Sequence, residues 1–302
     1  MSEELPAVAE ARMAEIRSSG TWGSALTAAE FAAIRSVGFE PVGQVFGAAV
    51  YSAGGIGGYS CPGAQGLSGD RWPARPAAEV SGRGGAGSFG PLVQTMDLAR
   101  HTAVGRMITE CAGLGGHGVV GVRLSWGSFP LGGPQFTVLG TAVRAPGAAH
   151  GPPVPFTCEV PGQDFAKLIR AGWVPAGVVF GISIGSRHDD RTTARQARWG
   201  SGNTEVAGWT ELVTQSRHDA RRQLETDVKR LGAEGVVIAA MQMRVRERDC
   251  PESAGRRDHI VEATLAGTAV ARFAPARQPD SAPALAIMPL SPRRRQAARI
   301  QI

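Results

Sequence analysis

The most apolar stretches of the chain are two runs that each begin at a proline, Pro41–Val50 and Pro175–Ile184. Nearly every position in them is apolar or glycine, without the alternation expected of a strand that has one wet face. Such continuous runs are typical of strands that are covered on both faces. The pattern therefore predicts one buried strand in each half of the chain.

Two longer segments, about 91–111 and 208–230, have the apolar spacing of a helix that packs on a sheet. In the first segment Val104 and Ile108 add a second apolar face, which the second segment lacks. This face predicts either a contact between domains or subunits, or a wider contact with the core. The stripe residues are Leu92, Met96, Ala103, Met107, Cys111 and Leu114 in the first segment and Trp209, Val213, Ala220, Leu224, Val228 and Leu231 in the second.

Short helices and hairpins complete the expected elements. Thr27 and Glu30 have the spacing of a capping box, which predicts a short helix after Thr27. A second short helix is expected to start near 161–164. Each long helix is followed by two strands with a Gly/Pro-rich or polar link, which is typical of a hairpin. These strands are expected at 119–126, 135–144, 236–244 and 262–273.

The two halves resemble each other in sequence. Phe31–Val50 aligns without a gap on Phe165–Ile184, with eight of twenty positions identical, and two later blocks recur in the same order. We therefore predict a tandem duplication. The expected organisation is a helical or flexible N-terminal segment, 1–30; repeat 1, 31–145, with a Gly-rich insertion at 52–90; a Pro/Gly linker, 146–160; repeat 2, 161–273, with a polar insertion at 186–207; and a basic disordered tail, 274–302.

The blocks "LGGHGVVGVRL" and "LGAEGVVIAAM" and the closing "GTAV" strands resemble the YbjQ-like family, whose label names heavy-metal binding. The resemblance implies an α+β fold in which each repeat is a dodecin-like β-α-β-β unit, a long helix on an antiparallel sheet. It also implies assembly, since single-domain members form five-membered rings. A two-copy chain allows stacked rings, a ring with an even number of copies, or pairing of the two copies within a monomer.

Composition and charge limit the classes of protein to which this chain can belong. The chain has 302 residues, 43% of them hydrophobic, and no apolar run long enough to span a membrane. Neither a signal peptide nor a C-x-x-C pair is present, so we expect a cytoplasmic protein with free thiols. The net charge is +6, and much of it lies in the Arg-rich tail. That tail is either solvated or contacts an anionic surface. Nucleic-acid binding is not favoured, because the strands consist mainly of Val, Ala, Gly and Thr and do not interleave aromatic with basic residues.

Candidate sites are few. His188, Asp189 and Asp190 follow a strand and offer ligands for a metal ion, the one kind of cofactor that we consider. Cys250 and His259 are an alternative pair across a hairpin loop. Two Arg-His pairs lie at equivalent positions of the two long helices, and we interpret them as ligand or interface residues or as ordinary surface residues. They are Arg100 with His101 and Arg217 with His218.

No hydrolase or P-loop signature occurs in the sequence. Gly113, Gly115 and Gly118 spell G-x-G-x-x-G, but they follow a helix and precede a strand, the reverse of a dinucleotide loop. We expect a non-enzymatic, oligomeric binding or assembly module. The alternatives are an interaction protein that recruits a partner through its insertions and tail, and an enzyme whose site is the polar loop after Ile184.

Overall fold

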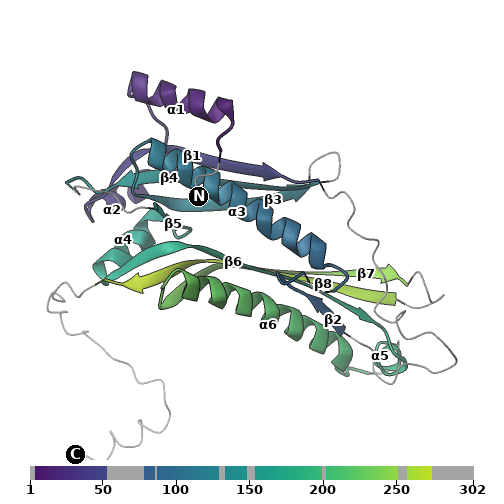
Figure 1. The fold of residues 1–302 in the computed structure, drawn as a ribbon. Helices are drawn as coiled ribbons and strands as arrows, with labels where there is room; N and C mark the ends of the chain where they lie inside the picture. The colour runs from purple at the N-terminus through teal and green to yellow at the C-terminus, as the bar shows by residue number, and fades with distance from the viewer. Residues whose placement is uncertain are drawn as a thin grey trace, which may run out of the picture.

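The computed structural model describes residues 4–52, 78–85, 87–128, 133–147, 154–198, 202–250 and 257–273. These residues form two four-stranded sheets with two long helices (Figure 1). Neighbouring strands are antiparallel except for one short pair. The predicted α+β class is therefore confirmed.

Sheet A contains β1 (Glu40–Val50), β3 (Gly118–Ser128), β4 (Pro134–Arg144) and β5 (Phe156–Cys158). Their order is β1-β4-β3-β5, and β5 lies parallel to the start of β3. Sheet B contains β2 (Ala78–Ser81), β6 (Trp173–His188), β7 (Gly235–Asp249) and β8 (Arg257–Arg272). Their order is β2-β6-β8-β7, so the three long strands are arranged in the same order in both sheets.

Each half of the chain gives one short strand to the sheet of the other half. β2 precedes the first long helix in sequence but pairs with β6, and β5 comes after the β3–β4 hairpin, at the start of the second half, yet pairs with β3. Parts of the expected insertion 52–90 and of the expected linker 146–160 are therefore strands. The other domain boundaries remain predictions. Cys61, most of the Gly-rich insertion and the tail 274–302 lie outside the described residues.

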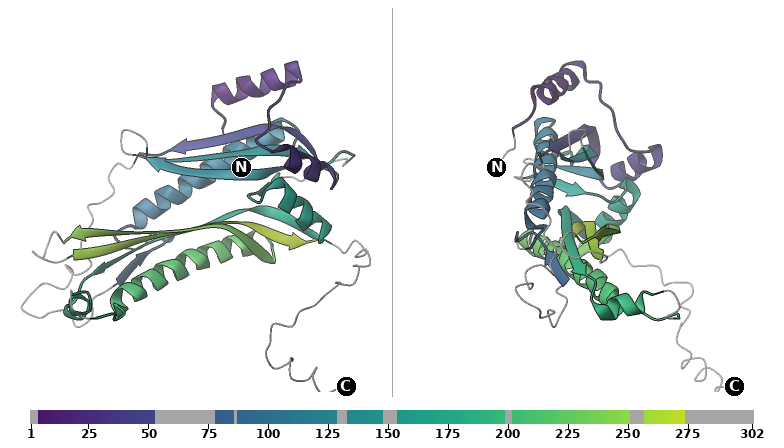
Figure 2. Two further views of the ribbon diagram at one scale, coloured as in Figure 1. Left: turned by 180° about the vertical axis from the view of Figure 1, so that it is seen from behind. Right: turned by 90° about the vertical axis from the view of Figure 1, so that its right-hand side faces the viewer.

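The long helices are α3 (Gly90–Gly113) and α6 (Ala207–Arg230), and both begin and end close to their predicted positions. α3 packs on β1 and β4 and reaches β6, whereas α6 covers the opposite face of sheet B (Figures 1 and 2). The layers are thus sheet A with α3, then sheet B, then α6. The shorter helices are α1 (Ala7–Ser19), α2 (Ala28–Arg35), α4 (Gly162–Arg170) and α5 (Arg191–Gln196).

Local sequence signals explain several element boundaries. The Thr27 hydroxyl accepts a hydrogen bond from the Glu30 amide and the Glu30 carboxylate accepts one from the Thr27 amide, so the predicted capping box is confirmed. α3 ends at Gly113, and Gly115 has a φ of 72° in the turn before β3. The glycines of the G-x-G-x-x-G spelling therefore form a helix-to-strand turn, as predicted.

The prediction of burial on both faces is correct for β6 and wrong for β1. Along β6, Val179 packs with α6 and Phe180 with α3 and sheet A, because two layers enclose the strand. Along β1 the burial alternates, and Phe46 and Val50 are 41% and 49% exposed on the outer face. Val104 packs against the main core cluster, which favours a wider core contact for the second apolar face of α3.

No helix in the described part of the chain is long and apolar enough to cross a membrane.

Candidate functional site

The strands of sheet B extend beyond the length of their counterparts in sheet A, and the extension is polar. β6 and β8 have 16 residues each and β7 has 15, whereas β1, β3 and β4 have 11 each. In this extension the register places His188 opposite Asp258 and Glu247 opposite His259. Titratable side chains that are distant in sequence therefore meet at one end of the sheet.

His188, Cys250 and Asp258 form the candidate metal centre. Nδ1 of His188 lies 2.7 Å from Oδ1 of Asp258, and one ligand atom from each of the three residues lies within 4.8 Å of the other two. Because zinc–ligand bonds measure about 2.0–2.3 Å and the four ligands are tetrahedral, the ligand atoms of one zinc ion lie about 3.3–3.8 Å apart. The three ligand atoms span a range on both sides of this spacing, so the side chains would have to adjust to hold such an ion.

The donor set fits a soft or borderline metal ion. A thiolate, an imidazole and a carboxylate suit Zn²⁺ and its transition-metal neighbours, whereas Mg²⁺ and Ca²⁺ prefer oxygen ligands alone. Asp258 is fully buried and Cys250 is 7% exposed, so the site is largely screened from water. Three protein ligands leave a fourth position for water or for a ligand atom from another molecule.

A second cluster lies beside this centre, around His259. Its Nδ1 is 3.1 Å from Oδ1 of Asp189 and its Nε2 is 3.4 Å from Oε1 of Glu247. Its ring contacts Trp209 at 4.4 Å between centroids, with the two ring planes tilted by 42°. Burial alone would lower the pKa of His259, but the carboxylates of Asp189 and Glu247 outweigh burial and raise it. A protonated His259 neutralises these acids and does not act as a metal ligand. The cluster lines a cavity of about 760 Å³.

The structure thus separates the three residues that the sequence grouped as metal ligands. His188 joins Cys250 and Asp258, while Asp189 accepts a hydrogen bond of 3.0 Å from Trp209 Nε1. Asp190 caps α5 by accepting a hydrogen bond of 2.6 Å from the Thr193 amide. Burial raises the pKa of Asp190, but the Thr193 hydrogen bonds and Arg187 outweigh it, and the net shift is downward.

The two Arg-His pairs occupy different environments although their sequence positions are equivalent. Arg217 and His218 are exposed on α6. His101 has a side chain 45% exposed and lies 3.6 Å from Oδ2 of Asp97, whereas Arg100 is 5% exposed and lies among aromatic rings. The pairs therefore do not form one repeated site, and Arg100 alone of the four lines a pocket described below.

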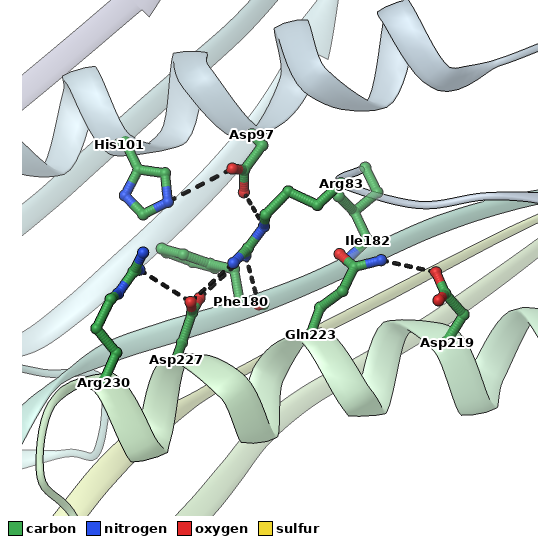
Figure 3. A network of polar contacts seen from close by, with 9 residues as sticks. All are labelled: Arg83, Asp97, His101, Phe180, Ile182, Asp219, Gln223, Asp227 and Arg230. Carbon is green, nitrogen blue, oxygen red and sulfur yellow. Dashed lines mark hydrogen bonds and ion pairs between the residues drawn. The ribbon is translucent and has the colours of Figure 1, made fainter. Parts of the chain in front are cut away.

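Arg83 connects the two long helices, which the sequence did not suggest (Figure 3). Its guanidinium donates to both carboxylate oxygens of Asp227 at 2.7 and 3.0 Å and to the Phe180 carbonyl at 2.9 Å. Its Nε lies 2.9 Å from Oδ1 of Asp97 on α3. Burial lowers the pKa of Arg83, but Asp227 and Asp97 more than offset this, so its pKa is raised. Arg83 is therefore a charged link between α3, α6 and β6.

Sequence reasoning also missed a pair of buried acids at equivalent helix positions, Glu110 and Asp227. Glu110 is 1% exposed, accepts a hydrogen bond of 2.8 Å from the Phe46 amide of β1 and pairs with Arg12. Asp227 is 3% exposed and forms an ion pair with Arg83. The signal in the sequence that could have found them is an acidic residue in each long helix, one position before the stripe residues Cys111 and Val228.

Two comparisons with known proteins bear on this geometry. Residues 82–146 match the model of the family described as "Putative heavy-metal-binding". That segment contains α3, β3 and β4 but none of the residues His188, Cys250 and Asp258. Over 280 residues the chain is 31% identical to the encapsulin nanocompartment protein Rv1762c of Mycobacterium tuberculosis strain H37Rv, and the alignment covers 90% of this chain and 93% of that one. Identity of this extent along nearly the whole of both chains shows common descent, and the protein therefore belongs to the same family as Rv1762c.

Proposed function

We propose that the protein is a non-enzymatic assembly module whose chains associate through the open edge of sheet B. Three observations support assembly: the name of its relative, which refers to a nanocompartment; the resemblance to a family that forms rings; and the exposed surface of β7. The last of these carries the proposal. The free thiols of Cys111, Cys158 and Cys250 fit the expected reducing, cytoplasmic setting.

β7 is an edge strand of 15 residues that leaves one side of its backbone unpaired within sheet B. Met241 and Val245 lie opposite Leu265 and Val261, which are buried, yet they are themselves 54% and 57% exposed. Ile238, before the bulge, is 51% exposed. A long edge strand with an apolar face is a template for pairing with another strand. A second copy of the chain would cover both the backbone edge and these side chains.

The tandem duplication belongs to the same proposal. The common order of the long strands supports it, as do bulges at matching places, between Pro41 and Gly43 in β1 and between Pro175 and Gly177 in β6. Duplication of an assembling unit gives each chain two edges of related shape, which suits stacked or even-numbered rings. Ring size follows from the mass of the assembly.

Charges placed on β7 test the assembly. We expect the wild-type chain to form one defined oligomer at micromolar concentration, and a Met241→Glu, Val245→Glu double variant to fall toward the chain mass of 31.5 kDa. The reason is that pairing would bury the new carboxylates without partners. Light scattering after size exclusion measures both masses.

The matched control for this experiment is Leu98→Glu, because Leu98 on α3 is 52% exposed and lies away from β7. Its oligomer should equal that of the wild type. A wild-type protein that elutes as a monomer would contradict the assembly, and a double variant of unchanged mass would contradict the role of β7.

We further propose that the assembly module binds a soft or borderline divalent metal ion through His188, Cys250 and Asp258. The close approach of three chemically suitable ligand atoms supports this second function. The chain's own contribution is an imidazole and a carboxylate held close together, and a thiol that must lose its proton on binding. No catalytic step is assigned to the site.

Cobalt titration tests the metal site. We expect one equivalent of Co²⁺ to give a thiolate-to-metal charge-transfer band, and Cys250→Ser to abolish it and weaken binding at least ~100-fold, beyond the effect typical of outer-shell partners. Cys158→Ser is the control, because burial raises the pKa of the Cys158 thiol to about 12 and that residue lies in sheet A. A band that survives in Cys250→Ser, or a wild type without one, would rule the site out.

The alternative function is recruitment of a partner through the Gly-rich insertion and the Arg-rich tail. The polar insertion 186–207 would contribute as well. Residues 53–77 and 274–302 lie outside the described part of the chain, whereas the polar insertion contains α5.

A further inference from the structure

A pocket of about 320 Å³ lies between the two sheets, on the side where β3 and β4 face β6, β7 and β8. It is independent of the metal centre and shares no residue with it. Its walls combine aromatic rings with a few charged groups, the composition of a small-molecule site. The residues that matter for the argument are Arg100, Trp126, Phe136, Glu159, Phe180 and Arg244.

Arg100 is the central polar group of the pocket. It is 5% exposed, and its guanidinium carbon lies 5.5, 5.8 and 5.5 Å from the ring centroids of Trp126, Phe136 and Phe180. Its Nε and Nη1 are buried and have no hydrogen-bond partner among the described residues. Burial lowers the pKa of Arg100 to about 10, so the group still carries its charge at neutral pH.

A buried cation with unused donors is unusual, because an unpaired charge and each unsatisfied donor destabilise the folded state. The three rings compensate in part through cation–π attraction, but a ring face accepts no hydrogen bond along the guanidinium plane. Arg100 therefore has the properties of an anion receptor that is prepared before its ligand arrives.

Glu159 is the second polar group of the pocket. Its amide donates a hydrogen bond of 2.9 Å to Thr268 Oγ1, which fixes the residue just after β5, while its Oε2 is buried without a partner among the described residues. Burial raises the pKa of Glu159 to about 7. Near neutral pH a large share of the molecules therefore carry a neutral carboxylic acid here, which donates a hydrogen bond instead of repelling an anion.

We propose that this pocket binds a small organic acid, with its carboxylate on Arg100 and its flat apolar body against Trp126 and the neighbouring rings. The carboxylate supplies acceptors to the unused guanidinium donors, and Glu159 is a second polar group on the wall of the same pocket. The aromatic walls favour a planar apolar group over a hydrated inorganic ion. Inorganic phosphate would use the charge but not the rings.

The other charged groups around the pocket set its pH dependence. Arg244 of β7 lines the pocket, and the charges of Asp97, Arg83 and Glu262 act on Arg100. Arg100 keeps its charge across the neutral range, whereas Glu159 titrates within it. Since its ionisation places a second anion in the pocket, affinity for a carboxylate falls as the pH rises through about 7.

Calorimetric titration of the full chain with benzoate tests the proposal, because benzoate joins one carboxylate to one flat ring. Benzoate should bind one site per chain at least tenfold more tightly than benzamide, its neutral analogue, and more tightly at pH 6 than at pH 8. Equal binding of the two compounds, or no saturable binding of benzoate, overturns the proposal without any variant. Binding of phosphate in preference to benzoate also overturns it.

Variants locate the binding. Arg100→Gln should weaken benzoate at least tenfold, while Arg217→Gln, at the equivalent but exposed position of α6, should leave it unchanged. Glu159→Gln should retain binding and lose the dependence on pH between 6 and 8. Thermal melting of each variant shows that it is folded. Benzoate affinity that is unaffected by Arg100→Gln would place the ligand elsewhere and refute the assignment.

Discussion

Gly181→Ala is expected to destabilise the protein by at least about 3 kcal/mol, more than ordinary overpacking of a core. A Cβ atom at Gly181 would lie 1.9 Å from the carbonyl oxygen of Ala220, which belongs to the backbone of α6. A flexible side chain could move away from such a contact, but a helix backbone can yield only if the whole helix shifts from β6. At about 2–4 °C per kcal/mol, Tm should fall by roughly 6–12 °C.

The control for Gly181 is Gly127→Ala, because Gly127 also lies in a strand but has no atom within 4 Å of an added Cβ. The Gly127→Ala protein should have the same Tm as the wild type. The same close approach recurs in the first half, where a Cβ at Gly47 would lie 1.9 Å from the carbonyl oxygen of Ala103. A Gly181→Ala protein that melts within about 2 °C of the wild type would mean that α6 lies farther from β6 than described.

Asp227→Ala is expected to lower the free energy of unfolding by about 3–5 kcal/mol, the usual effect of removing one partner of a buried ion pair. Asp227 has a side chain 4% exposed and accepts from both Arg83 and Arg230. Its loss leaves the Arg83 guanidinium, whose side chain is 22% exposed, with Asp97 and the Phe180 carbonyl as its remaining partners. Urea unfolding followed by circular dichroism measures the change.

Two further variants test whether the loss of stability comes from the charge of Asp227 and from its burial. Asp227→Asn keeps an oxygen acceptor and should lose less stability than Asp227→Ala. Asp164→Ala breaks an ion pair with Lys167 whose side chains are 53% and 75% exposed, and it should cost no more than about 1 kcal/mol. Equal losses for Asp227→Ala and Asp164→Ala would show that the Arg83 contact is not a buried ion pair.

Elements whose signal is local could be predicted from the sequence. The capping box at Thr27, the ends of α3 and α6 and the turn after Gly113 all depend on residues within a few positions of one another. Burial of β1 on both faces was predicted wrongly because the run of apolar residues says nothing about how many layers surround it. Sheet A is an outer layer at Phe46 and Val50, whereas β6 of sheet B is enclosed by α6 on one face and by α3 and sheet A on the other.

The candidate sites depend on contacts between distant positions, and the sequence showed them only in part. His188 was identified because it follows a strand, but its partners Cys250 and Asp258 meet it only through the register of β6 on β8. Arg83 lies in a Gly-rich stretch without periodicity, so nothing local marked it as a core residue. Arg100 resembled its exposed counterpart Arg217 until packing distinguished them.

The exchange of β2 and β5 between the halves has a consequence for how this architecture can change over time. A single cut or a swap of one half for a homologous half would remove a strand from the sheet that remains as well as from the one that leaves. The two halves must therefore change together, since a change in the register of β6 must suit β2, and a change at the start of β3 must suit β5. Exchange of one half as an independent module would leave both sheets incomplete.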